Sequence, residues 1–131
     1  MKCEDFYFLL LLIKNMTCFW DSLRNKLNIN DTNREFILYL KKSNTKNISV
    51  NWNSSELTEK NLEENFEHIK NFDENKINNG YDCSICDPFL ILVCELYNIN
   101  IFHNFNGYNM KYIKDDSYKN INCSSNTSHF S

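Results

Sequence analysis

The stretch DPFLILVCELY at residues 87–97 constrains the fold more than any other part of this sequence. Asp87 is a good helix N-cap, and Pro88, the only proline in the chain, suits the first turn of a helix. The run that follows is almost wholly apolar, so it fits either a buried strand or a buried helix. The Asp-Pro start and the length of the run favour a helix. We therefore expect a buried helix over residues 88–97.

Period-two patterns follow this segment. NINIFHNF places Ile99, Ile101 and His103 on one face, and NGYNMKYIK alternates apolar residues after a turn at residues 106–107. These patterns predict two antiparallel strands. A further strand is expected around residues 119–123, turning at SSNT into SHFS at the end of the chain.

Signals for three further helices lie before residue 87. Trp20, Leu23 and Leu27 fall on one face of a helix that starts at about Cys18. A capping box at residues 32–35 marks a second helix, and residues 55–72 carry apolar residues at helical spacing, which predicts a third. Helices first and a small, mostly antiparallel sheet last give an α+β fold.

Composition limits the class of protein. The 131 residues suit one domain, 42% of them are apolar, and the net charge of −3 offers no basic stripe for nucleic acid. The run FYFLLLLI at 6–13 is too short to span a bilayer. It has a thin basic flank and no small-residue cleavage site, so we interpret it as a buried first element and not as a signal peptide. The six cysteines are then expected to be reduced, in a cytoplasmic, monomeric protein that binds neither nucleic acid nor membrane.

Cys18 follows Thr17, a good N-cap, so its thiol is expected at the positive end of a helix. The dipole and the free N–H groups there favour the thiolate, which is the reactive form. The alternative is a small apolar residue packed under the helix start, because free cysteine is among the most buried residue types. The sequence alone leaves both readings open.

Three histidines are candidate partners for Cys18. His68 fits a solvated helix face, and His103 fits a half-buried strand position. His129 has no evident structural reason to lie so near the end of the chain, and a distant Cys–His pair is the usual way to build such a nucleophile. Separately, Cys83 and Cys86 form a CxxC that would bind zinc only with further ligands such as Cys94 or Cys123, and we expect no metal there.

Three segments together resemble the ovarian-tumour (OTU) family of papain-like cysteine proteases. LIKNMTCFWDSL is similar to the family's nucleophile motif, and GYDCSICDPFLILVCELYNINIFHNF resembles its turn, buried helix and strand. INCSSNTSHF resembles its last hairpin, whose second strand carries the catalytic histidine before an aromatic residue. The three segments occur in the order of the family, so the resemblance implies one OTU-like domain over residues 1–131. The alternative is that this domain is truncated at its C-terminus and lacks a final strand.

The resemblance also implies roles. Cys18 is the nucleophile and His129 the general base, while Asn15, Met16 and Thr17 form the oxyanion hole. Ser131 falls where many members have the residue that orients the imidazole, Met16 replaces a glycine and Asn15 replaces an aspartate. The expected function is a cofactor-free deubiquitinase that cleaves after the C-terminus of ubiquitin or a ubiquitin-like protein. The alternative is a catalytically weak or inactive ubiquitin-binding module of the same fold.

Overall fold

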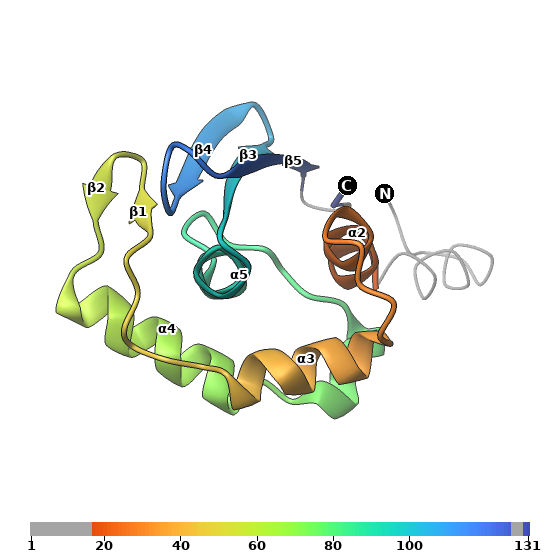
Figure 1. Cartoon of the computed structure of the whole chain (residues 1–131). Coiled ribbons are helices and arrows are strands. Elements are labelled where there is room, and N and C mark those ends of the chain that lie inside the picture. Colours follow the sequence, from red (N-terminus) through yellow and green to blue (C-terminus); the bar gives the residue numbers. More distant parts are fainter. Residues whose placement is uncertain (1–16, 127–129) are drawn as a thin grey trace.

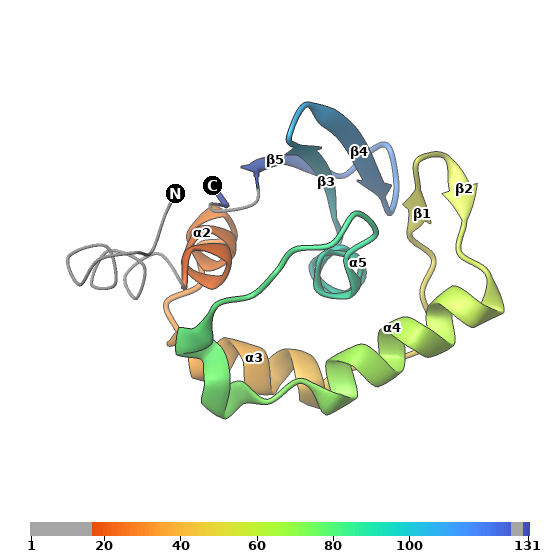
Figure 2. The same cartoon turned by 180° about the vertical axis from the view of Figure 1, so that it is seen from behind.

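Helix α5 (Pro88–Tyr97) runs through the centre of the molecule. In the computed structural model, which describes residues 17–126 and 130–131, α5 lies between a sheet on one side and helices α3 (Asn33–Lys42) and α4 (Glu59–Asn71) on the other (Figure 1). The view from behind shows the same three layers (Figure 2). Residues 88–94 of α5 are all buried. The predicted buried helix is therefore confirmed.

The ends of α5 follow from local chemistry. Asp87 Oδ1 accepts hydrogen bonds from the backbone N–H groups of Phe89 at 2.9 Å and Leu90 at 3.3 Å, so it caps two of the free donors at the helix start. Asn98 ends the helix in the left-handed conformation, with φ of 54°. The chain then enters strand β3 (Ile99–Phe105).

The described residues form a five-stranded sheet in the order β2-β1-β4-β3-β5. Its three long strands are β3 (Ile99–Phe105), β4 (Tyr108–Ile113) and β5 (Lys119–Ser125). Strands β3 and β4 are antiparallel, joined through Asn106 and Gly107, which both have positive φ as a type I′ turn requires. Strand β5 pairs parallel to β3, and the remaining pairs are antiparallel. The α+β class and the mostly antiparallel sheet are confirmed.

Asn100 holds the connection that carries the chain from β4 across to β5. It is buried at 1% exposure, and its Oδ1 accepts hydrogen bonds from the backbone N–H groups of Lys114 and Asp115. Its Nδ2 donates to the carbonyl of Asp115 at 2.7 Å, and also contacts Tyr118 O and Asn120 Oδ1. The Asn100 side chain thus pairs backbone groups of the connection between β4 and β5, which lies outside the sheet.

The first helix, α2 (Cys18–Lys26), begins where the sequence predicts. Its N-cap is Thr17, but the Thr17 hydroxyl donates to Asp21 Oδ2 at 2.7 Å and makes no capping hydrogen bond to the helix backbone. The expected side-chain cap is therefore wrong, because the carboxylate one turn along competes for the hydroxyl. The capping box of α3 at Thr32 and Glu35 is present as predicted.

The expectation of helices first and sheet last is wrong. A small hairpin, β1 (Asn51–Trp52) and β2 (Ser55–Glu56), comes between α3 and α4 and joins the sheet through β4. Asn53 and Ser54 turn it with positive φ, so α4 starts at Glu59 under its own N-cap, Thr58, and not at residue 55. A 3-10 helix, η1 (Glu74–Asn79), follows α4.

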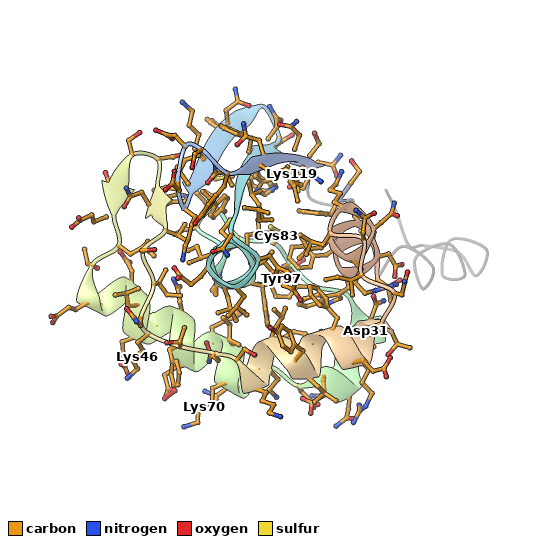
Figure 3. The ribbon with its side chains drawn as sticks, viewed as in Figure 1. Asp31, Lys46, Lys70, Cys83, Tyr97 and Lys119 are labelled. Atoms are coloured by element: carbon orange, nitrogen blue, oxygen red, sulfur yellow. The ribbon has the colours of Figure 1, made fainter. Side chains whose placement is uncertain are left out.

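Aromatic rings join α2 to the rest of the core. Trp20 is fully buried, and its ring centroid lies 4.9 Å from Phe89, 5.4 Å from Tyr81 and 5.7 Å from Phe72. Charged side chains such as those of Lys46 and Lys70 lie on the outside of the molecule (Figure 3). None of the helices in the described ranges is both long enough and apolar enough to cross a bilayer. The packing fixes α2 against α5, which sets the position of Cys18.

Candidate active site

Cys18 is half-buried at the first position of α2 and touches the opposite end of the chain. The backbone N–H of Phe130 donates a hydrogen bond to Cys18 Sγ at 3.3 Å, across 112 residues of sequence. Figure 1 shows the C-terminus beside the start of α2. The thiol is therefore placed at a junction between the first described helix and the last described residues.

The end of β5 brings Phe130 to this position. Ser124 and Ser131 exchange two backbone hydrogen bonds, at 2.8 and 2.7 Å, and Ser125 and Phe130 form an antiparallel bridge. The Phe130 side chain is 4% exposed, and its ring centroid lies 4.7 Å from that of Phe19. Strand pairing and core packing thus hold Phe130 against α2.

An open groove of about 380 Å³ adjoins the Cys18 side chain. Aromatic rings and short polar groups line it: Cys18, Tyr81, Asp82, Cys83, Phe105, Ser125, Asn126 and Phe130. Asp82 is exposed and supplies the carboxylate of the lining. The groove gives a molecule that approaches Cys18 an apolar surface with polar contacts.

Buried Asp87 fixes one wall of the groove. The hydroxyl of Tyr81 donates to Asp87 Oδ2 at 2.9 Å, and the Ser84 N–H donates to the same oxygen at 3.0 Å. Burial raises the pKa of the Asp87 carboxyl, although these hydrogen bonds act in the opposite direction. Asp87 N–H in turn donates to the Tyr112 hydroxyl at 3.1 Å, which ties the loop to β4. In the sequence, Asp87 signals only a helix cap, and no pattern signals the place of Tyr81 in the groove.

The thiols other than Cys18 in the described residues lie in surroundings that favour the neutral form. Burial raises the pKa of Cys86 and of Cys123 to about 11, and it raises the pKa of Cys83 and Cys94 further. Cys83, which is labelled in Figure 3, is half-buried and lines the groove. These four side chains are poor nucleophiles near neutral pH.

The sequence-predicted site residues fall on both sides of the described boundary. Asn15, Met16 and His129 lie outside the described residues, as does the apolar run at 6–13. Thr17 lies in the turn before α2. Ser131 pairs with Ser124, and its hydroxyl lies 3.4 Å from the Ser124 carbonyl that it donates to.

The two described histidines differ in environment. His68 is exposed on α4, with Nε2 3.4 Å from the Tyr81 hydroxyl. His103 is 1% exposed, its Nε2 lies 2.5 Å from Ser125 Oγ, and burial lowers its pKa to about 4. His103 is thus a core residue, more buried than the half-buried position that the sequence predicts.

The described residues offer no set of ligands for a zinc ion at Cys83 and Cys86. In residues 17–126 and 130–131, no three His, Cys, Asp or Glu side chains are arranged to hold a metal ion. Cys83 and Cys86 instead belong to the loop that Asp87 organises.

Comparison with family models, curated proteins and solved structures finds no match to this chain. The geometry around Cys18 therefore carries the functional argument.

Proposed function

We propose that this chain is a cytoplasmic, monomeric cysteine-type deubiquitinase of the OTU type, acting after the C-terminus of ubiquitin or a ubiquitin-like protein. The observation that carries the proposal is the hydrogen bond from Phe130 N–H to Cys18 Sγ at 3.3 Å. Phe130 directly follows the proposed base, His129, in the sequence, so a contact between Phe130 and Cys18 supports the proposal. The groove beside Cys18 offers room for an extended peptide tail.

The chemistry is a two-step acyl transfer. His129 takes the proton of Cys18, the sulfur forms a bond to the carbonyl carbon, and the carbonyl electron pair moves onto the oxygen. Collapse of this adduct breaks the carbon–nitrogen bond, and the departing amine takes the proton from His129. Water then adds to the thioester, gives a proton to His129, and displaces the Cys18 thiolate, which is reprotonated.

The developing oxyanion needs donors near Cys18. The proposal assigns this to the Asn15 side chain and to the backbone N–H groups of Met16 and Thr17. It keeps Ser131 as the candidate third member that orients His129, since a hydroxyl that donates to the Ser124 carbonyl can still accept a hydrogen bond from an imidazole N–H. The alternative is a Cys–His dyad without a third member.

Labelling by a ubiquitin whose C-terminus carries a thiol-reactive group tests the proposal. Cys18→Ala should abolish labelling, and His129→Ala should slow it by about 10²- to 10⁴-fold, which is the usual range for general-base catalysis. Asn15→Ala should fall between wild type and His129→Ala. His68→Ala and Cys86→Ser are the matched controls, because an exposed histidine and a half-buried thiol outside the groove lining should leave the rate unchanged.

Two results would contradict this assignment. If His103→Ala silences a folded protein while His129→Ala does not, the base is wrong. If wild-type protein binds ubiquitin but is never labelled, the chain is a binding module and not an enzyme.

A further inference from the structure

The backbone of Phe130 points its N–H away from the sheet. In an antiparallel ladder, residue pairs alternate between those that exchange two hydrogen bonds and those that exchange none. Ser124 and Ser131 are an exchanging pair, so the neighbouring pair of Ser125 and Phe130 is of the other kind. The N–H of Phe130 is consequently not used by β5, and it donates to Cys18 Sγ instead.

This donor is held in place by groups other than the thiol. The Phe130 ring is buried against Phe19, at 4.7 Å between centroids, and against His103, at 5.5 Å. The two backbone hydrogen bonds of Ser131 fix the chain on the other side of Phe130. The N–H therefore needs no rearrangement when charge appears on the sulfur, which is the condition for an effective electrostatic donor.

We propose that the main-chain N–H of Phe130 is a catalytic group that stabilises the Cys18 thiolate, both as nucleophile and as leaving group. The proposal rests on the proposed role of Cys18 as the nucleophile. A hydrogen bond from a neutral donor is stronger when the acceptor is charged, so this N–H favours the thiolate over the thiol. During attack, negative charge leaves the sulfur for the carbonyl oxygen; during hydrolysis of the thioester it returns to the sulfur. The N–H thus assists the second step directly, and it assists the first by raising the thiolate population.

The size of the effect on thiol reactivity follows from two opposing terms. Losing a hydrogen bond to a charged group lowers the thiolate population by about 10- to 100-fold. The remaining thiolate is more nucleophilic, and with a Brønsted slope of about 0.5 this recovers roughly half of the loss on a logarithmic scale. The net slowing of alkylation below the pH at which the thiol ionises is therefore about three- to tenfold.

Exchange of one amide for an ester removes this N–H alone. Cys123 allows a synthetic segment 123–131 to be ligated to residues 1–122 without any sequence change. The test protein carries phenyllactic acid in place of Phe130, which keeps the ring and replaces N–H by oxygen. The reference is the all-amide ligation product. The matched control carries the ester at Ser131, which removes a ladder hydrogen bond but not the donor to Cys18.

Alkylation of Cys18 by iodoacetamide at pH 6, followed by mass spectrometry, is the measurement. The ester at position 130 should slow alkylation about three- to tenfold, while the ester at 131 should stay within about twofold of the reference. Equal rates for the two esters would overturn the proposal. If the ester at 130 slows alkylation but no form is labelled by reactive ubiquitin, the donor stands and the deubiquitinase assignment falls.

A measurement on the unmodified chain covers the case in which the ester at 130 does not fold. The amide proton resonance of Phe130 should shift over the pH range in which the alkylation rate of Cys18 rises. In Cys18→Ala the same resonance should lack the part of the shift that depends on the thiol. A Phe130 amide that behaves identically in the two proteins would overturn the proposal.

Discussion

His103 is a histidine that folding keeps neutral. Its side chain is 1% exposed, and burial lowers its pKa to about 4, whereas an unfolded histidine has a pKa of about 6.5. Between these two values the unfolded chain binds more protons than the folded one. The contribution of neutral His103 to stability is therefore complete above about pH 6.5 and is lost as the pH falls toward 4.

Denaturant unfolding of wild type and His103→Gln between pH 7 and pH 4 checks this. One pKa unit corresponds to 1.36 kcal/mol, so wild type should lose about 3 kcal/mol more than the variant over this range. The carboxylates titrate in both proteins, so the difference between the two curves isolates His103. Parallel curves would show that His103 is not held neutral by its burial.

At the scale of residues, the sequence predicts what depends on residue type and local position. The placement of Cys18 at a helix start was predicted from Thr17 as the N-cap residue and from the apolar spacing of Trp20 and Leu23. The donor from Phe130 is a main-chain group, so no side-chain pattern signals it. Tyr81 reaches the groove because buried Asp87 holds its hydroxyl, and that pairing is visible only in three dimensions.

At the scale of elements, α5 depends on a buried cap, while α3 depends on an exposed one. Asp87 accepts hydrogen bonds from Tyr81, Ser84, Phe89 and Leu90, whereas the Thr32 hydroxyl accepts one from Glu35 N–H at 3.1 Å. Asp87→Ala should destabilise the protein by about 3 to 5 kcal/mol, because buried donors lose their charged acceptor. Thr32→Ala should cost only about 1 kcal/mol. Free energies of unfolding in urea compare the two, and equal losses would contradict the role given to Asp87.

The burial of α5 has a sharper test in a matched pair of leucines. Leu92 in α5 is 1% exposed, and Leu38 in α3 is 40% exposed. Leu92→Asp should unfold the domain, because an unpaired charge in the core costs several kcal/mol, comparable to the total stability. Leu38→Asp should remain folded. Circular dichroism and thermal melting distinguish these outcomes, and a folded Leu92→Asp with an unchanged melting temperature would place α5 outside the core.

Elements with strong local signals were predicted and elements defined by distant pairing were not. The helices at Cys18, Thr32 and Asp87 carry start signals in the sequence. The hairpin of β1 and β2 has two residues in each strand, too few to show a period of two. Strand β5 could pair parallel with β3 or antiparallel with β4, and no local pattern in the sequence encodes that choice.

At the scale of the whole molecule, the described cysteines form no disulfide bond. Cys18, Cys83, Cys86, Cys94 and Cys123 are all free thiols. Cys3 lies outside the described residues; with it, we expect titration in denaturant to find six free thiols, and elemental analysis to find no zinc. In the folded protein, buried Cys94 and Cys123 should react more slowly than half-buried Cys18. One equivalent of zinc, or fewer than six thiols, would contradict this prediction.

The contact between Cys18 and Phe130 has a consequence for how the protein acquires its chemistry. It joins residues 112 positions apart. Contacts of such sequence separation form late, because closing a long loop costs conformational entropy before the contact stabilises the chain. During synthesis, α2 leaves the ribosome long before β5 and the residues that follow it. A nascent or half-folded chain therefore carries Cys18 without its main-chain partner. If the Phe130 N–H has the proposed role, the gain in Cys18 reactivity of about three- to tenfold appears only after this contact has formed, so the alkylation rate of Cys18 reports when the two segments meet.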